Sequence, residues 1–125
     1  MPVSYQTDGS GNLTVFTATG ELTLDDQIAA LTPFYEGQPT KHVLFDLRSI
    51  TGSRISSQEL EKIAEFMSQY KDKRPKGKTA LVVSTELDYG LARMITFFSE
   101  IRGVPWSINV FYSMDEAVGW INSAQ

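Results

Sequence analysis

The segment HVLFDL at residues 42–47, followed by SSQE at residues 56–59, is the most informative part of the chain for its architecture. The first segment is a short apolar run, which suits a strand covered on both faces. The second has the spacing of a capping box, in which Ser56 and Glu59 satisfy the backbone at the start of a helix. The helix that follows has an apolar face made of Leu60, Ile63, Ala64, Met67 and Tyr70. These residues predict a strand followed by a capped helix.

The same alternation continues on both sides of this unit. Residues 3–7 and 13–19 are strand-like and flank the turn-forming residues 8–12, which predicts an N-terminal β-hairpin. A helix with Thr23 as its N-cap is expected to stop at Gly37.

Beyond the central unit, strands are expected over residues 79–84 and 107–112, and a helix over residues 87–102 that ends at Gly103. The last helix begins at a second capping-box pattern, residues 113–116. The order ββαβαβαβα predicts an α/β fold with a mixed, mostly parallel five-stranded sheet and about four helices. We expect all 125 residues to form one domain.

The composition narrows the classes of function. The chain has no cysteine, which excludes disulfides, thiolate metal sites and cysteine nucleophiles. Its net charge of −4 argues against non-specific nucleic-acid binding. No apolar run approaches the roughly 20 residues that span a bilayer, and no secretory signal is visible. We therefore expect a cytoplasmic protein with no transmembrane segment and no cofactor.

The sequence also argues against an enzyme. His42 is the only histidine and begins a strand, whereas sites in open α/β sheets gather beyond the carboxyl ends of strands. Asp46, Glu86 and Asp88 have no spacing that indicates an acid–base pair. One imidazole and scattered carboxylates also predict no metal site.

The helix expected over residues 87–102 has an unusually wide apolar face. On a helical projection this face covers about 160°, and it comprises Leu87, Leu91, Met94, Ile95, Phe97, Phe98 and Ile101. Tyr89 and Arg93 continue round the same edge as Phe97. One interpretation is ordinary burial under neighbouring helices. The other is that Tyr89, Arg93 and Phe97 form a dimer or partner surface, with Arg93 also placed to help the helix start bind an anion.

Two polar segments have alternative interpretations as well. Residues 48–57 follow a strand and contain Arg48, Ser49, Thr51, Ser53, Arg54 and Ser56. They predict either an anion or phosphorylation site or a capped loop whose serines bond backbone donors. The basic run over residues 71–78 also has two interpretations. It could bind an acidic partner or an anionic membrane surface. Alternatively, its cations complement the end of the preceding helix and keep a loop solvated.

Several segments, taken in order, resemble the SpoIIAA-like (STAS-related) group of small bacterial proteins over residues 20–121. The segments that carry the resemblance are GELT at 20–23, FDLR at 45–48, YGLARM at 89–94, VF at 110–111, DEA at 115–117 and WI at 120–121. The resemblance implies a STAS-like fold.

Better-studied members of that group are anti-sigma-factor antagonists, switched by phosphorylation of a serine in the loop after a strand. That loop reads Asp-Leu-Ser, a spacer, then Asp-Ser-Ser-Gly. Here Asp46 and Leu47 match its start, but Arg54 and Ile55 stand where the aspartate and the phosphorylated serine belong, and only Ser56 matches. The phosphoswitch is therefore not carried over to this chain.

The resemblance, together with the missing catalytic groups, predicts a non-catalytic regulatory or protein-interaction module. The expected partners are a second copy of the chain and a regulatory protein. The group is also linked with Sec14-type lipid-binding modules, so the alternative prediction is a binding domain for a lipid or a small anionic ligand.

Overall fold

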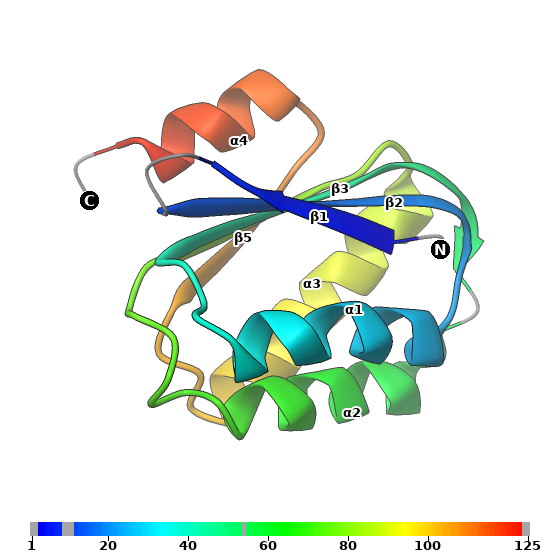
Figure 1. Ribbon diagram of the computed structural model, residues 1–125. Helices are drawn as coiled ribbons and strands as arrows, with labels where there is room; N and C mark the ends of the chain where they lie inside the picture. Colours follow the sequence, from blue (N-terminus) through cyan, green and yellow to red (C-terminus); the bar gives the residue numbers. More distant parts are fainter. Residues whose placement is uncertain (1–2, 9–11, 54, 124–125) are drawn as a thin grey trace.

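The computed structural model describes residues 3–8, 12–53 and 55–123 of the chain (Figure 1). Its elements confirm the predicted order ββαβαβαβα. They are β1 (Val3–Thr7), β2 (Leu13–Leu22), α1 (Leu24–Glu36), β3 (His42–Ser53), α2 (Ser57–Ser68), β4 (Lys78–Val82), α3 (Glu86–Ile101), β5 (Ser107–Phe111) and α4 (Met114–Ile121). The turn predicted between β1 and β2 falls on residues 8–12, of which 9–11 lie outside the described residues.

The five strands form one sheet in the order β1-β2-β3-β4-β5. β1 is antiparallel to β2, and all other neighbours are parallel, so the predicted mixed sheet with an antiparallel edge is confirmed. Because the strand order follows the chain, right-handed crossovers place the connecting helices on one face. Figure 1 shows α1, α2 and α3 on that face and α4 on the other.

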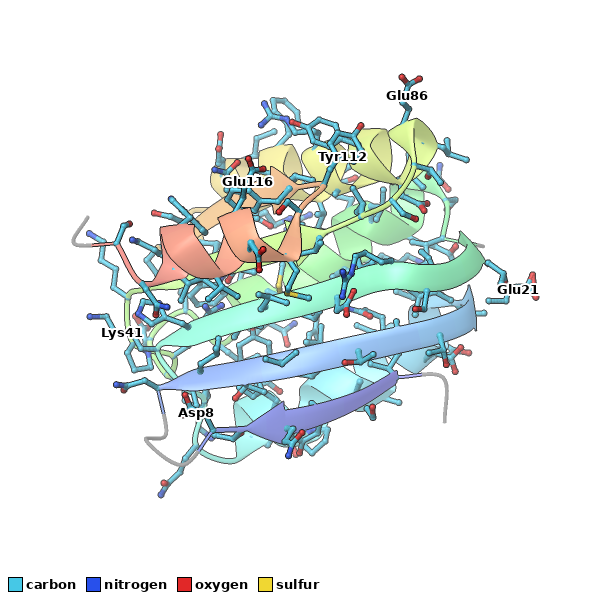
Figure 2. All side chains as sticks on the ribbon, turned by 90° about the horizontal axis from the view of Figure 1, so that it is seen from above. Asp8, Glu21, Lys41, Glu86, Tyr112 and Glu116 are labelled. Carbon is cyan, nitrogen blue, oxygen red and sulfur yellow. The ribbon has the colours of Figure 1, made fainter. Side chains whose placement is uncertain are left out.

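Each face of the sheet has its own core. The larger core lies under α1, α2 and α3 and includes Phe16, Leu31 and Val43. The smaller core lies under α4 and consists of Leu44, Ala80, Val82, Ala117 and Ile121. Figure 2 shows that α4 covers only part of its face, because β1 and β2 lie uncovered beside it.

Side-chain caps define where the helices begin. In each of the described helices the side chain of the N-cap residue accepts a hydrogen bond from the backbone N–H of the residue three positions later. The N-cap residues are Thr23, Ser56, Thr85 and Ser113. The predicted capping box of Ser56 and Glu59 is confirmed. α3 ends, as predicted, before Gly103, whose φ of 74° is readily adopted only by glycine.

β2 and β3 are longer than the sequence predicts. They were expected over residues 13–19 and 42–47, but they remain paired until Leu22 and Ser53. Register shifts lie between Thr17 and Thr19 and between Gly20 and Glu21. They interrupt the alternation of side chains between the two faces of the sheet, so the later parts of β2 and β3 have no strand-like sequence pattern. The prediction that residues 48–53 form a loop is therefore wrong.

The basic run over residues 71–78 is not one solvated segment. Arg74 and Lys78 are buried, with 3% and 6% of their surfaces exposed. The guanidinium of Arg74 donates to the carbonyls of Lys41 and Lys78 and lies 4.4 Å from the centre of the Trp106 ring. For these two residues an outer docking surface and a solvated loop are both wrong, because their charged groups are buried and bonded within the chain. Lys78 does complement a helix end, since its ammonium group donates to the carbonyl of Trp120 near the end of α4.

Candidate functional site

The side of α3 that faces the core carries small residues. Its buried positions are Ala92, Thr96 and Ser99, where α3 packs against α2 and β5. The hydroxyls of Thr96 and Ser99 donate to the carbonyls of Ala92 and Ile95 at 2.9 and 2.7 Å. Because the helix itself accepts these bonds, the two hydroxyls are buried without losing a partner. α3 can therefore lie close to its neighbours.

The large apolar side chains of α3 are consequently displaced towards solvent. Leu87, Phe97 and Ile101 are 73%, 58% and 65% exposed. Leu91, Met94, Ile95 and Phe98 are only partly buried against the larger core. The interpretation of the apolar arc as ordinary burial is therefore wrong for the three most exposed residues. We call the surface formed by Leu87, Gly90, Arg93, Phe97, Glu100 and Ile101 the α3 face.

Two opposite charges flank Phe97 on this face. Arg93 stands four residues before Phe97 and Glu100 three residues after it, so all three side chains lie on the same side of the helix. Arg93 and Glu100 are exposed, and within the described part of the chain neither side chain has a hydrogen bond or an ion pair. The α3 face therefore combines an aromatic ring with two charges that have no partner there.

Tyr89, the third residue of the predicted surface, lies at its border. Its ring stacks on that of Tyr112 with centroids 4.9 Å apart and an interplanar angle of 11°. Tyr89 is half-buried, whereas Tyr112, directly after β5, is exposed (Figure 2). Tyr112 is not among the residues predicted for this surface, and its only signal in the sequence is its position as an aromatic residue just beyond a strand.

Of the polar residues predicted over 48–57, the ones that the structure describes do not form one cluster. Arg48 forms two hydrogen bonds with the carboxylate of Asp46, at 2.9 and 3.0 Å. These bonds hold the pKa of Asp46 below its usual value. Ser49 and Thr51 are exposed on the extension of β3, and the hydroxyl of Ser56 caps α2. The side chain of Ser53 and all of Arg54 lie outside the described residues.

The carboxyl edge of the sheet, where an anion site was expected, is acidic. All four described helices begin at this edge, and their first turns contain Asp25, Asp26, Glu59, Glu86, Asp88, Asp115 and Glu116. Figure 2 shows Glu21 and Glu86 at this edge and Lys41 at the opposite one. Carboxylates at helix starts are stabilised by the helix dipole, but together they disfavour a bound anion.

His42 has a structural contact at the amino edge of the sheet. Its Nδ1 accepts a hydrogen bond from the backbone N–H of Lys78 at 3.1 Å. Desolvation, followed by the charges of Lys41, Lys78 and Arg74, lowers the pKa of His42. Among residues 3–8, 12–53 and 55–123, no group of three or more histidine or acidic side chains could hold a metal ion. No helix in the same ranges has the length and hydropathy of a membrane span.

A mixed five-stranded sheet with three helices on one face and a short fourth helix on the other is the SpoIIAA-like fold, and two solved structures share it. One is an uncharacterized protein of the DUF3478 family with a SpoIIAA-like fold from Shewanella loihica PV-4. It has 20% sequence identity to this chain and a TM-score of 0.60, and the alignment covers 95% of this chain and 91% of that one. The other is an anti-sigma factor antagonist from Mycobacterium paratuberculosis, with 11% identity and a TM-score of 0.59, covering 97% and 95% of the two chains.

These likenesses establish the SpoIIAA-like fold that the sequence predicted. No family model matches the sequence. No curated protein matches it either.

Proposed function

We propose that this chain is a non-catalytic regulatory module that binds protein through its α3 face, and that the partner is a second copy of the chain. The observation that carries the proposal is the exposure of Leu87, Phe97 and Ile101 on a helix that turns its small residues to the core. Fully burying one such side chain is worth roughly 1.5–3 kcal/mol. A partner that covers this face would therefore gain a substantial part of its binding energy there.

Gly90 gives independent support, because it lies on the same face. A methyl group placed on Gly90 would meet nothing within 4 Å. Glycine inside a helix costs about 1 kcal/mol relative to alanine, and no close packing within the chain offsets that cost. The close approach of another molecule would explain why this position lacks a side chain.

The charges on the α3 face favour a second copy as the partner. In a symmetric dimer the same patch meets itself. If two α3 helices cross antiparallel at Phe97, each Arg93 lies opposite the Glu100 of the other copy, because these residues stand on either side of Phe97. One crossing would therefore bury both aromatic rings and pair both sets of charges.

A regulatory role is supported by the fold. One of the proteins that share it is an anti-sigma factor antagonist. Two groups that could serve acid–base catalysis have structural partners among the described residues instead: His42 accepts a hydrogen bond from the backbone, and Asp46 is paired with Arg48. We expect the module to act in the cytoplasm.

The test is the oligomeric state of matched variants, measured by sedimentation velocity over a range of concentrations. Wild type is expected to dimerise, and Phe97→Glu is expected to be monomeric because it places a charge at the centre of the interface. Val118→Glu is the control, since Val118 is an exposed apolar residue on α4, on the other face of the sheet; it should dimerise like wild type. Circular dichroism of each variant checks that the fold is kept. A wild type that stays monomeric at high concentration would contradict the second copy as partner.

A further inference from the structure

An open pocket of about 290 Å³ lies between the end of α3 and the start of β5. It is lined by Ser99, Glu100, Val104, Trp106, Ser107 and Ile108. Ser99 and Trp106 are 1% and 3% exposed and form its floor, whereas Glu100 and Ser107 are exposed at its mouth. A single water needs roughly 10–15 Å³ on this measure, so the pocket has room for a whole side chain. Because it shares Glu100 with the α3 face, the pocket borders that face directly.

The electrostatics of this pocket favour a positively charged occupant. Among the described residues that line it, Glu100 is the only ionisable one. Its carboxylate has no hydrogen bond or ion pair within the described part of the chain. The pocket also lies beside the last turn of α3, which contains no basic residue. The negative end of the helix dipole therefore adds to the attraction that the carboxylate exerts on a cation.

Two cations of the chain lie near this end of α3, but neither lines the pocket. The guanidinium of Arg102 is 3.4 Å from the carboxylate of Glu65 and 3.8 Å from that of Glu61, so it is directed towards α2. The ammonium nitrogen of Lys71 lies 3.7 Å from the place that a Cβ on Gly103 would occupy. No cation from the described residues therefore fills the pocket, and the cation that it favours comes from another molecule.

The shape and chemistry of the lining favour arginine over a smaller cation. Val104 and Ile108 are half-buried apolar residues of the wall, against which an aliphatic stem can pack. At the mouth, a guanidinium can donate two parallel hydrogen bonds to the carboxylate of Glu100 and is more weakly hydrated than an ammonium group. The hydroxyl of Ser107 can accept a further N–H. An arginine side chain therefore matches both the wall and the mouth.

We propose that this pocket binds an arginine side chain of the protein that docks on the α3 face. The proposal rests on the proposed function for the source of that arginine, which in the dimer is Arg93 of the second copy. Arg93 is exposed and has no hydrogen bond or ion pair among the described residues, and the antiparallel crossing at Phe97 places it opposite Glu100. Phe97 then contributes apolar burial, while the pocket selects partners that present an arginine beside it.

The test is an NMR titration of the ¹⁵N-labelled Arg93→Gln variant, whose own side chain cannot compete for the pocket. The probes are N-acetyl-arginine amide and N-acetyl-citrulline amide, which have the same stem but differ in the charge of the head group. The arginine probe should give saturable shifts at the backbone amides of Val104, Ser107 and Ile108. It should bind at least about fivefold more tightly than the citrulline probe, the value of one exposed ion pair. Equal binding of the two probes, or no saturable shift at these amides, would overturn the proposal.

Adding Glu100→Gln to this variant should abolish the preference for the arginine probe. Glu86→Gln is the matched control, because Glu86 is an exposed carboxylate in the first turn of α3, at the other end of the helix; it should keep the preference. The oligomeric state of wild type separates this proposal from the proposed function. A wild type that dimerises while both probes bind equally would overturn the pocket alone. Selective binding of the arginine probe beside a monomeric wild type would support the pocket and contradict only the second copy as partner.

Discussion

The ammonium group of Lys78, at the start of β4, donates a hydrogen bond of 2.8 Å to the carbonyl oxygen of Trp120, near the end of α4. It also bonds the carbonyl and the hydroxyl of Ser123, at 3.1 and 2.6 Å. The last carbonyls of a helix have no partner within the helix, and a cation there is favoured by the helix dipole. Lys78 therefore anchors the end of α4 to the sheet.

Replacing Lys78 should loosen α4. Lys78→Met removes the three hydrogen bonds that the ammonium group donates to Trp120 and Ser123, so we expect the free energy of unfolding to fall by about 2 kcal/mol. Urea unfolding measures the loss, and hydrogen exchange should show it concentrated in α4. Lys76→Met is the control, since Lys76 is exposed in the same basic run. Similar losses in both variants would show that the anchor contributes nothing.

Exchanging the charges on the α3 face should weaken and then restore the proposed dimer. Arg93→Glu and Glu100→Arg each place like charges opposite one another at both ends of the crossing. Each should raise the dissociation constant by about fivefold, since exposed ion pairs contribute up to about 1 kcal/mol. The double variant should return close to the wild-type value in sedimentation equilibrium. A double variant as weak as the two single effects combined would rule out the antiparallel crossing at Phe97.

Thr79→Val should stabilise the protein, although it removes a hydrogen-bonding group. The hydroxyl of Thr79 is buried without a partner among the described residues, so its loss removes a desolvation cost of about 1 kcal/mol. Thermal unfolding measures the change. Thr96→Val should not stabilise, because the hydroxyl of Thr96 is paired with the carbonyl of Ala92. A destabilised Thr79→Val would mean that the hydroxyl has a hydrogen-bond partner in solution.

His42 should make stability depend on pH in the range where histidine titrates. Its pKa is lowered in the folded chain, so the unfolded chain takes up the proton first as the pH falls. The stabilisation that neutral His42 provides is therefore fully present above the ordinary histidine pKa of about 6.5. It is lost as the pH falls through the pKa that His42 has in the folded chain. Urea unfolding at pH 7.5 and 5.5 should show a loss in wild type. It should be smaller in His42→Asn, whose side-chain oxygen can still accept from Lys78. An equal loss in both would assign the effect to other groups.

The features predicted correctly from the sequence are those set by neighbouring residues. The caps at Thr23, Ser56 and Ser113 act over three residues, and the alternation of strands and helices follows from local patterns. Those signals were sufficient for the element order and the mixed sheet. The continuation of β2 and β3 was missed because Gly20 and the register shifts remove the alternation while the backbones stay paired.

The parts that the sequence did not reveal depend on contacts between distant segments. The burial of Arg74 requires Trp106, and that of Lys78 requires Trp120. On α3 the periodicity left both burial and a partner surface open for the large residues, and close packing with α2 selected small residues such as Ala92 for the core.

The agreement between strand order and chain order has a consequence for how the protein forms. Each parallel strand pairs with the next strand along the chain, so each pairing closes one loop containing a single helix. The entropy lost on closing a loop grows with its length, and folding slows as contacts become more distant in sequence. We therefore expect the sheet to assemble strand by strand from the N-terminal hairpin during synthesis, with α4 docking last when Lys78 finds its carbonyl partners.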